Sequence, residues 1–430
     1  MADRAGFTVG IGVRDITPPD TLIRDGRIWL WGFGSRTKPA DGVHDRLNAQ
    51  ALVIRDAQGA AIVLVSVDLG ALDPFLTAAV RVRVEREHGI PAERTCINVT
   101  HTHGAPAVVS IPTWSPRFDR ADPEYLRLVE DGIVDAIRAA ILAEAPAALQ
   151  FARGSTGIAY DRHFGEPGFH DPTLDVLRAI RPNGETIVTA CFTACHAVAR
   201  GDYNRVNTDF VGPARMRIEQ EFGGVALFFQ AFTGISNPKV RDAERIGAEL
   251  AEHVIGLCRG SMEEITGSVE GRLDVIRFPF QPLPAESNLK RARETAGIYR
   301  RWARAMAELG STCPAELTTP IQAIRIGEGE DAWILSISAH EVTSDLGAPI
   351  RALRPRNRVT LLGFSNSQLS YLPSRRVLTL PSAEEPFPFC ANYEGGVAFA
   401  WYGHRAPLSF DVDERFVAGY AALLDRAPAY

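Results

Sequence analysis

The chain has 430 residues, a formal net charge of −6 and a pI near 6.0. Its hydrophobic fraction of 46% and charged fraction of 23% are those of an ordinary globular protein, which excludes a disordered or fibrous chain. The acidic balance disfavours a nucleic-acid partner, because binding to phosphates favours clustered Lys and Arg.

The N-terminus and the cysteines bear on the cell compartment. Residues 1–6 carry charge where a secretion signal needs an apolar core, and no run of roughly 18 apolar residues occurs. We therefore expect a cytoplasmic protein without stable membrane association. The six cysteines form no C-x-x-C pair, which disfavours a disulfide framework or a Cys-type zinc site, and Cys191 and Cys195 are expected to be buried thiols.

Strand patterns dominate the start of the chain. Residues 7–13 are typical of a strand, and residues 51–54 and 62–67 favour a hairpin. Residues 76–88 then place apolar side chains at helical spacing, and residues 96–99 form a short apolar run that favours a strand.

The middle and the end of the chain continue to mix both types of element. A long helix is predicted over 122–145, and Pro182-Asn183-Gly184 is a turn signal between strands at 174–180 and 186–192. Further helices are expected at 210–221, 240–258, 285–309 and 413–425. Further strands are expected at 225–230, 269–278, 319–326, 332–338 and 358–363.

Hairpins mixed with alternating helices predict an α/β fold with a layered mixed β-sheet core flanked by helices. Neither an internal repeat nor an obvious linker divides the chain. We therefore expect one catalytic domain over residues 1–430.

His101 and His103 frame an H-T-H motif directly after the expected strand at 96–99. On a strand, side chains at i and i+2 share a face, so both imidazoles are expected to point into one site. Metal binding or catalysis is one interpretation of this motif, and structural hydrogen bonding is the other.

Two further polar residues also follow apolar strand patterns. His196 comes at the end of an expected strand over 187–195, and neutral imidazole is a common zinc ligand, although a lone His after an apolar strand is more often a core residue. Glu341 follows the apolar run at 333–338, where a carboxylate is unusual and capping of a helix is the alternative.

Several short motifs follow one another over most of the chain. They are Asp68-Leu-Gly, His101-Thr-His, His196, Asn207-Thr-Asp-Phe-Val-Gly-Pro-Ala, Phe232-Thr-Gly-Ile-Ser-Asn, Glu341, Tyr371 and Tyr393-Glu394. Their order and spacing together resemble the N-terminal catalytic domain of the neutral/alkaline ceramidase family. The resemblance implies a metal-dependent hydrolase that acts on amide bonds.

The resemblance also implies one zinc ion per chain, held by His101, His196, Glu341 and Tyr371. Two His and one Glu are the ligands of several hydrolytic zinc sites, which leave room for an activated water. Tyr371 would in addition assist the oxyanion, and His103 would lie beside the metal as a catalytic proton shuttle.

Other residues match the family at positions around the metal. Ser236 stands where the family has its active-site serine, as a further catalytic candidate. Arg162 and Thr233 are candidates for substrate contact. The pair Tyr393 and Glu394 is expected to support the loop that carries the tyrosine ligand.

The chain departs from the family around the substrate. It has Gly104-Ala-Pro-Ala where the family continues with Ser-Gly-Pro-Gly, and Thr233-Gly234 where the family has Gly-Asp. It also ends at Tyr430, where we expect no C-terminal immunoglobulin-like domain to follow. We therefore expect a small, partly apolar, soluble amide, lactam or ester as the substrate.

Aromatic residues in the loops at 30–44 and 104–122 and beside them favour a pocket with apolar walls, and an ordinary core is the equal alternative. They are Trp29, Trp31, Phe33 and Trp114. A homo-oligomer is compatible with the sequence, and neither a dinucleotide motif nor a phosphate-binding loop is present.

Four alternative functions stay open at this point. The same metal would also suit a lyase, and the resemblance would suit an amidase of N-acyl lipids. A serine hydrolase built on Ser236 is weaker, since G-x-S-x-G is missing. A binding protein without catalytic activity is the fourth, because a fold does not fix a function.

Overall fold

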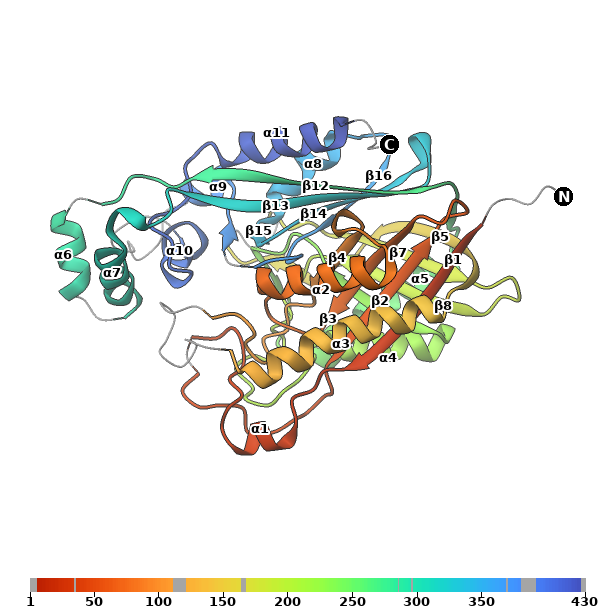
Figure 1. Ribbon diagram of the computed structural model, residues 1–430, viewed down its shortest axis with the longest axis horizontal. Coiled ribbons are helices and arrows are strands. Elements are labelled where there is room, and N and C mark those ends of the chain that lie inside the picture. Colours follow the sequence, from red (N-terminus) through yellow and green to blue (C-terminus); the bar gives the residue numbers. More distant parts are fainter. Residues whose placement is uncertain are drawn as a thin grey trace.

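The computed structural model describes residues 6–34, 36–110, 121–163, 168–284, 286–294, 297–368, 370–379 and 392–426, and Figure 1 shows its helices and strands. Its largest element is a nine-stranded sheet. The strands run in the order β4 (Thr95–Val99), β3 (Ala61–Val67), β2 (Asn48–Arg55), β1 (Phe7–Asp15), β5 (Ala145–Ser155), β7 (Thr173–Ile180), β8 (Thr186–Thr193) and β9 (Val225–Gln230), and β11 (Glu263–Ile265) pairs with β5.

The strand pairs of this sheet are antiparallel except at its two edges, where β3 is parallel to β4 and β8 is parallel to β9. The Asn98 amide donates to the Gln230 carbonyl at 3.1 Å, and the Gln230 N–H donates to the Asn98 side chain at 2.8 Å. The sheet therefore curls around until β4 and β9 meet, and the loops after these two strands lie together.

A second sheet packs against the first. It has the order β12 (Val269–Pro279), β13 (Glu316–Ile326), β14 (Trp333–Ser338) and β16 (Arg358–Leu362), with β14 and β16 parallel. One apolar core lies between the two sheets, formed by side chains such as Leu64 and Phe229 from the first and Ile324, Trp333 and Leu335 from the second. Burial of this core holds the two sheets together.

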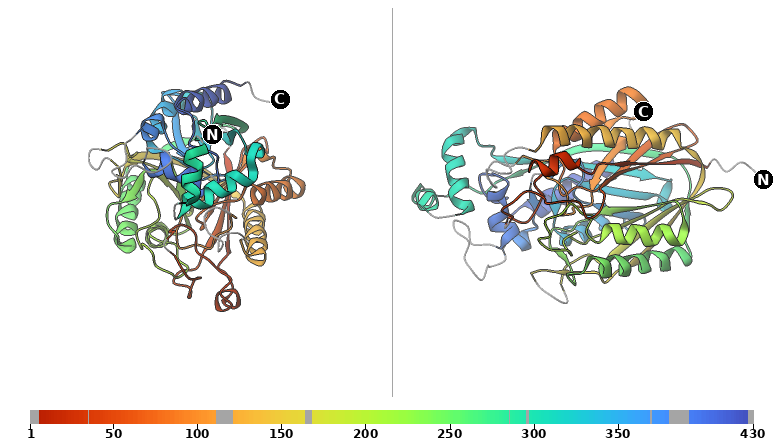
Figure 2. Two further views of the ribbon diagram at one scale, coloured as in Figure 1. Left: turned by 90° about the vertical axis from the view of Figure 1, so that its left-hand side faces the viewer. Right: turned by 90° about the horizontal axis from the view of Figure 1, so that it is seen from below.

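Helices cover the outer faces of both sheets. In Figure 2 the pairs α2 (Pro74–His88) with α3 (Pro123–Leu142), and α4 (Val211–Phe222) with α5 (Ala243–Arg259), lie on opposite sides of the molecule. Strands β3 and β8 are therefore covered on both faces, which explains their nearly continuous apolar sequences. On the second sheet, α8 (Gly347–Ala352) and α11 (Val412–Asp425) cover the face that points away from the first.

Two glycines let α3 lie directly on β1. A Cβ atom on Gly10 would come 1.9 Å from the Ala140 carbonyl oxygen, and one on Gly12 would come 2.1 Å from that of Ala136. Real atoms do not approach so closely, so a larger residue at either position would push the helix away from the sheet.

Shorter elements complete the fold. The helices are α1 (Asp20–Arg24), α6 (Glu286–Glu294), α7 (Ile298–Leu309), α9 (Arg375–Thr379) and α10 (Ala398–Trp401), with a π-helical turn at Tyr393–Val397. Short 3-10 turns lie at Ala92–Arg94, Gly310–Thr312, Gly329–Asp331 and Ser344–Leu346. Two small ribbons pair β6 (Ala159–Asp161) with β10 (Ser236–Pro238) and β15 (Glu341–Val342) with β17 (Tyr371–Leu372).

The layered α/β fold with a mixed sheet and flanking helices is confirmed, and so are both predicted hairpins. Several predicted elements differ from the structure in their extent. The helix predicted over 122–145 ends at Leu142, since β5, which the sequence did not reveal, begins at Ala145. The helix predicted over 285–309 is two helices, because Gly297 between them has φ of 85°. The strand predicted over 187–195 ends at Thr193.

Five cysteines lie in the described ranges, and all five are buried free thiols, as predicted for Cys191 and Cys195. Cys390 and Trp114 lie outside these ranges. Among the residues that the structure describes, no helix combines the length and the hydropathy that crossing a bilayer requires.

Candidate metal centre

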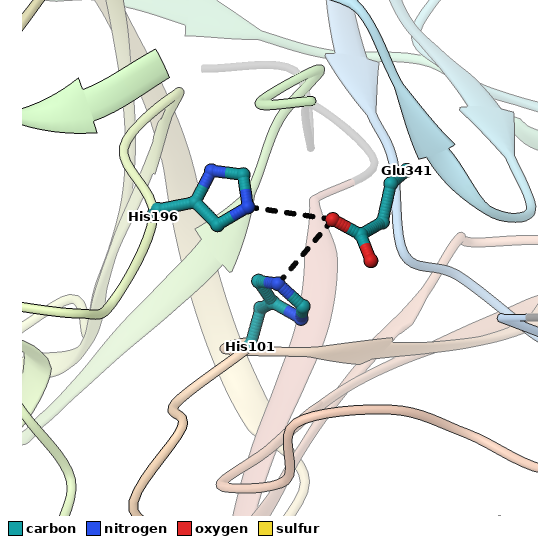
Figure 3. A group of neighbouring side chains, drawn as sticks. All are labelled: His101, His196 and Glu341. Atoms are coloured by element: carbon teal, nitrogen blue, oxygen red, sulfur yellow. Dashed lines mark hydrogen bonds and ion pairs between the residues drawn. The ribbon is translucent and has the colours of Figure 1, made fainter. Parts of the chain in front are cut away.

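The carboxyl ends of the parallel strand pairs meet at one place in the molecule. The chain leaves β4 toward His101, leaves β8 toward His196 and leaves β14 toward Glu341. Figure 3 shows the three side chains, from three separate segments, converging on one point. Ligand sites commonly form where the carboxyl ends of parallel strands lie next to each other.

His101 is held by the backbone around it. Its Nδ1 contacts the Gly70 carbonyl oxygen, and its ring lies against Phe364 at 4.3 Å between centroids. The contact with a carbonyl fixes the proton on Nδ1 and leaves Nε2 as the acceptor for a metal. His101 has φ of 59°, so its ring is aimed by a left-handed backbone conformation outside the strand.

His196 is held in the same way from another loop. Its Nδ1 lies 3.1 Å from the Ser236 carbonyl oxygen, and its Nε2 lies 3.3 Å from Oε2 of Glu341. The loop after His196 is fixed by Asp209, whose carboxylate accepts the backbone N–H groups of Ala199 and Arg200. Burial raises the pKa of Asp209, and these N–H groups partly offset the shift.

Glu341 divides its two oxygens between two directions. Oε1 accepts from the Gln368 amide at 2.6 Å and from the Tyr402 hydroxyl at 2.8 Å. Oε2 points to the two rings, 3.3 Å from Nε2 of His196 and 3.6 Å from Nε2 of His101. The carboxylate is thus oriented by protein groups on one side and is open to a cation on the other.

The three facing ligand atoms of His101, His196 and Glu341 lie within 4.8 Å of one another, and all three residues are buried. Burial lowers the pKa of His101 to about 4. Burial alone would raise the pKa of Glu341, but the neighbouring His101 and His196 lower it to about 2. A neutral imidazole, as in His101, and a charged carboxylate, as in Glu341, are the protonation states in which His and Glu side chains bind metal.

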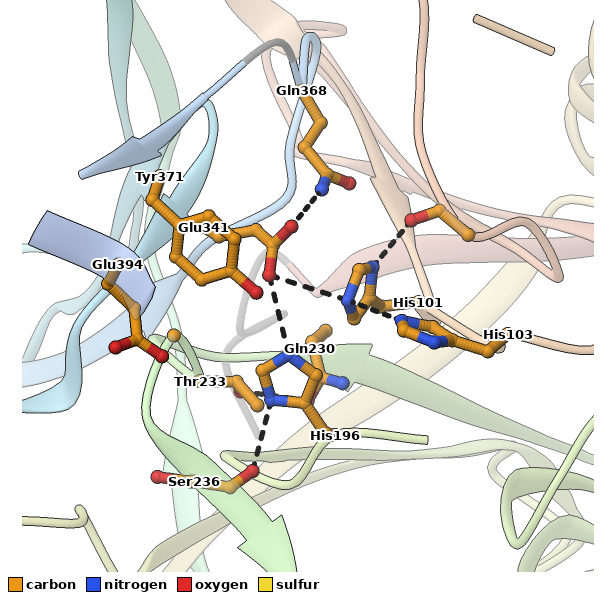
Figure 4. A network of polar contacts seen from close by, with 12 residues as sticks. His101, His103, His196, Gln230, Thr233, Ser236, Glu341, Gln368, Tyr371 and Glu394 are labelled. Atoms are coloured by element: carbon orange, nitrogen blue, oxygen red, sulfur yellow. Dashed lines mark hydrogen bonds and ion pairs between the residues drawn. The ribbon is translucent and has the colours of Figure 1, made fainter. Parts of the chain in front are cut away.

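Tyr371 lies beside this group, because β17 pairs with β15 so that Tyr371 is opposite Glu341. Figure 4 shows its hydroxyl directed toward the carboxylate of Glu341. Burial, together with the charge of Glu341, raises the pKa of Tyr371 well above its usual value. Arg162 approaches the same hydroxyl at 3.5 Å, donates to the Gly234 carbonyl at 2.9 Å and forms an ion pair with buried Glu394.

His103 also lies at this centre, with its Nε2 3.2 Å from Nε2 of His101. Both imidazoles reach one site as predicted, although the left-handed turn at His101 brings them together and not a shared strand face. Gly32 makes room for the second ring, since a Cβ there would lie 2.1 Å from Nδ1 of His103. Burial lowers the pKa of His103 well below its usual value.

Ser236 and Thr233 are buried just below this centre. The Ser344 hydroxyl donates to the Phe232 carbonyl at 2.6 Å, so the Ser236 hydroxyl, 2.9 Å from it, donates to Ser344. Ser236 faces His196 with its carbonyl oxygen, not with its hydroxyl. The Thr233 hydroxyl donates to neighbouring groups, Gln230 at 3.1 Å and the Ala231 carbonyl at 3.0 Å.

A cavity of about 500 Å³ opens above the centre. His103, His196, Glu341 and Tyr371 are among the residues that line it. Aromatic side chains form much of its wall: Trp31, Phe33, Tyr160, Tyr393, Trp401 and Tyr402. Trp31 and Phe33 thus line a pocket as predicted, whereas Trp29, Thr233 and Ser236 are not among the described residues that line it.

The sequence did not reveal several residues that hold the centre together. Gln230, the last residue of β9, donates to the carbonyls of Thr100 and Cys195 at 3.2 and 2.8 Å and so joins the loops that carry His101 and His196. Gln368 and Tyr402 orient Glu341. The sequence did contain a signal for Gln230. An amide side chain directly after the apolar run at 225–229 is as unusual as the carboxylate of Glu341 after the apolar run at 333–338.

Known proteins share both the sequence pattern and the fold. Residues 7–278 match the family described as neutral/alkaline non-lysosomal ceramidase, N-terminal. The neutral ceramidase of Drosophila melanogaster is 27% identical over 238 residues, which cover 51% of this chain and 33% of that protein. Neutral ceramidase A of Dictyostelium discoideum is 24% identical over 301 residues, which cover 61% of this chain and 40% of that protein.

These matches span well under half of the length of either relative. The crystal structure of neutral ceramidase from Pseudomonas aeruginosa superimposes with a TM-score of 0.77 at 22% identity, over all of this chain and 76% of that one. A structure described as ceramidase complexed with C2 gives a TM-score of 0.76 at 21% identity. The solved structures show the same fold, and the match over residues 7–278 shows that this chain belongs to the neutral/alkaline non-lysosomal ceramidase family.

Proposed function

We propose that this protein is a metal-dependent hydrolase that cleaves the carbon–nitrogen bond of an amide and uses zinc as its metal. The arrangement of Glu341 carries the proposal. Gln368 and Tyr402 occupy one carboxylate oxygen, and the other oxygen faces Nε2 of both His101 and His196. Family membership supports the reaction class.

The residues present fit a zinc ion. Two imidazole nitrogens and one carboxylate oxygen are the protein ligands of several hydrolytic zinc sites. The Nδ1 atoms of His101 and His196 already contact carbonyl oxygens, which is the usual support for a metal-binding imidazole. Tyr371 supplies a further oxygen beside Glu341 and, by the family resemblance, completes the ligand set.

A zinc ion bound here would polarise a carbonyl group and lower the pKa of a water molecule to roughly 7. The cavity holds the amide above His196 and Glu341, with the aromatic wall in contact with its apolar part. His103 accepts the proton of the attacking water and passes it to the leaving nitrogen. The Tyr371 hydroxyl donates a hydrogen bond to the carbonyl oxygen of the substrate, and Arg162 holds this hydroxyl in place.

A serine hydrolase is less compatible with this geometry. A nucleophilic serine needs a base within hydrogen-bond reach of its hydroxyl. The Ser236 hydroxyl contacts Ser344, and the contact of Ser236 with His196 is made by the carbonyl oxygen. We propose that Ser236 positions His196.

We further propose a small, partly apolar amide as the substrate, since the cavity of about 500 Å³ has the size of pockets that enclose a small ligand. Family membership favours a second candidate, an N-acyl lipid such as the ceramide from which the family takes its name. Short-chain ceramide and soluble aryl amides, assayed side by side, distinguish the two.

Metal analysis combined with an amidase assay tests the proposal. Protein purified without chelators is expected to contain about one zinc per chain in the wild type and in the control His253→Ala, whose side chain is exposed on α5. His101→Ala and His196→Ala are expected to lack both zinc and activity. A chelator should abolish wild-type hydrolysis and added zinc should restore it. Hydrolysis by metal-free wild type would refute the mechanism.

A further inference from the structure

Two motifs of the sequence are joined by one buried ion pair. Asp68-Leu-Gly comes directly after β3, and Asn207-Thr-Asp-Phe-Val-Gly-Pro-Ala leads into α4, where Arg215 follows at once. The Arg215 guanidinium donates to Oδ2 of Asp68 at 2.7 Å and to Oε1 of Gln50 at 2.5 Å. The side chains of Asp68 and Arg215 are 0% and 7% exposed, so the contact between the two motifs is shielded from water.

Asp68 fixes the loop that supports His101. The Asp68 N–H donates to the Asn48 carbonyl at 2.9 Å, and Oδ2 of Asp68 accepts the Asn48 N–H at 2.9 Å. Two residues further on, the Gly70 carbonyl contacts Nδ1 of His101. A Cβ on Gly70 would lie 2.2 Å from Cδ1 of Trp31, so Gly70 also packs directly against a residue that lines the cavity. Movement of Asp68 would therefore displace the carbonyl that orients His101.

The helix that carries Arg215 also braces the other imidazole. Asp209, just before α4, accepts the N–H groups of Ala199 and Arg200 and so fixes the loop after His196. Arg215, in the second turn of α4, reaches the loop after β3 instead. One helix thus connects the supports of both imidazoles.

Stability alone is a weak reason for this ion pair. Two charges that are removed from water carry a desolvation cost, and an apolar pair of the same volume is often as stable or more stable. Within the described part of the chain, Oδ1 of Asp68 accepts no hydrogen bond, so Arg215 is the group that balances this carboxylate. A directed, charge-assisted hydrogen bond also fixes the relative position of its two groups, which an apolar contact does not.

We propose that Asp68 and Arg215 form a positioning pair, which holds the Gly70 carbonyl against His101 and thereby sets the zinc affinity of the candidate metal centre. The inference rests on the proposed function, because zinc is the ion that this centre would hold. Neither Asp68 nor Arg215 is among the described residues that line the cavity. Both therefore act through His101 and not on the substrate.

Neutralisation of Asp68 tests this role. Asp68→Asn keeps the size of the side chain and an acceptor for the Asn48 N–H, but it leaves Arg215 without its counter-charge. In competition with a chromophoric chelator, the variant is expected to bind zinc about tenfold more weakly than wild type does, as on loss of a group that supports a metal-binding imidazole. An unaltered zinc affinity in the folded variant would overturn the inference.

Glu144→Gln is the matched control. Glu144 accepts two hydrogen bonds from the Arg55 guanidinium, both at 2.8 Å, at the opposite end of β2 from Asn48. The control is expected to lower the urea concentration at the midpoint of unfolding and to keep the wild-type zinc affinity. An equal loss of zinc affinity in the control would show that any loss of stability weakens zinc binding, and would overturn the positioning role.

The double variant Asp68→Asn/Arg215→Met separates position from stability. It leaves no uncompensated charge of this pair in the interior, so its midpoint of unfolding is expected to lie above that of Asp68→Asn. Its zinc affinity should stay about tenfold below that of wild type, since the directed contact is still missing. Recovery of the wild-type affinity would overturn the inference. This variant is sufficient for the test if Asp68→Asn does not fold.

Zinc affinity and amide hydrolysis are measured separately, which distinguishes this inference from the proposed function. Weaker zinc binding by the variants, together with no hydrolysis by zinc-loaded wild type, would support the positioning pair and refute the proposed function. Hydrolysis by wild type, together with wild-type zinc affinity in both variants, would overturn the positioning pair and leave the proposed function intact.

Discussion

Glu341 shows how a single side chain is prepared for a cation. Gln368 and Tyr402 both donate to Oε1, so rotation of the carboxylate would break two hydrogen bonds. The other oxygen is thereby fixed toward His101 and His196. Loss of such a hydrogen-bond partner typically weakens metal binding by about 10- to 100-fold.

Gln368→Ala is therefore expected to weaken zinc binding by about 10- to 100-fold without unfolding the protein. Competition with a chromophoric chelator measures the affinity. Gln58→Ala, at an exposed turn, removes the same side chain away from the centre and should leave the affinity unchanged. An unaltered affinity in Gln368→Ala would show that Glu341 is oriented without this amide.

Ser236→Ala is expected to keep its zinc and to lose no more than about tenfold in kcat/KM, because the carbonyl that holds His196 remains. A nucleophile removed from a catalytic unit would cost on the order of 10³-fold or more. Ser344→Ala removes the hydroxyl that accepts from Ser236, and it should likewise keep its zinc and lose no more than about tenfold in kcat/KM. Labelling of Ser236 by a fluorophosphonate probe would contradict this expectation.

At the residue scale, the sequence predicted which residues gather at the candidate site better than it predicted their hydrogen bonds. His101, His196 and Glu341 stood out because each follows an apolar strand, and the structure brings their ligand atoms together. The hydrogen bonds of Ser236 did not follow from its motif, since they depend on Ser344, 108 positions along the chain. Distant partners of this kind leave no local pattern.

At the level of elements, strained backbone gathers around the metal centre. The described residues include five non-glycine residues with positive φ: His101, Asp209, His340, Phe364 and Asn366. Each lies in a loop that carries a proposed ligand or braces one. Such conformations cost of order 1 to 3 kcal/mol each and persist where the surrounding structure holds them.

The contact of α3 with β1 gives a prediction about stability. Gly10→Ala and Gly12→Ala are each expected to lower the free energy of unfolding by about 1 to 3 kcal/mol, because a Cβ would overlap the Ala140 or Ala136 carbonyl. Chemical denaturation measures this change.

Gly256→Ala is the matched control. Apart from the backbone of α5 itself and the two neighbouring residues, no atom lies within 4 Å of an added Cβ at this exposed position. The free energy of unfolding is therefore expected to rise by about 0.5 to 1 kcal/mol. A gain in stability at Gly10 or Gly12 would show that α3 shifts without cost.

Long elements with clear periodicity were predicted well, and β5 shows why others were missed. Its sequence contains Ala, Pro146 and Gly154 and alternates only loosely, so nothing local distinguishes it from the end of α3. It becomes a strand because β1 and β7 lie on either side of it. The short pair of β15 and β17 depends in the same way on tertiary contacts.

At the scale of the whole molecule, the candidate metal centre joins the two sheets. His101 and His196 follow strands of the nine-stranded sheet, and Glu341 follows β14 of the second sheet. A ligand that binds only the folded state stabilises it by RT ln(1 + [L]/Kd), which is about 2.7 kcal/mol at a hundredfold excess over Kd.

Removal of zinc is therefore expected to lower the unfolding temperature of wild type, by an amount that grows with the free zinc concentration of the reference sample. Differential scanning calorimetry with and without chelator measures the shift. His101→Ala is expected to unfold at one temperature in both conditions. An equal shift in that variant would place the stabilising ion elsewhere.

The segment that matches the family ends at residue 278, before Glu341 and Tyr371. During synthesis both imidazoles leave the ribosome well before the carboxylate and the phenol do. A nascent chain that has only reached β11 therefore offers an ion two nitrogens and no oxygen from this centre. Under the proposed function, docking of the second sheet also completes the candidate metal centre, so amidase activity that arises during translation is expected to report that docking and not the folding of the first sheet.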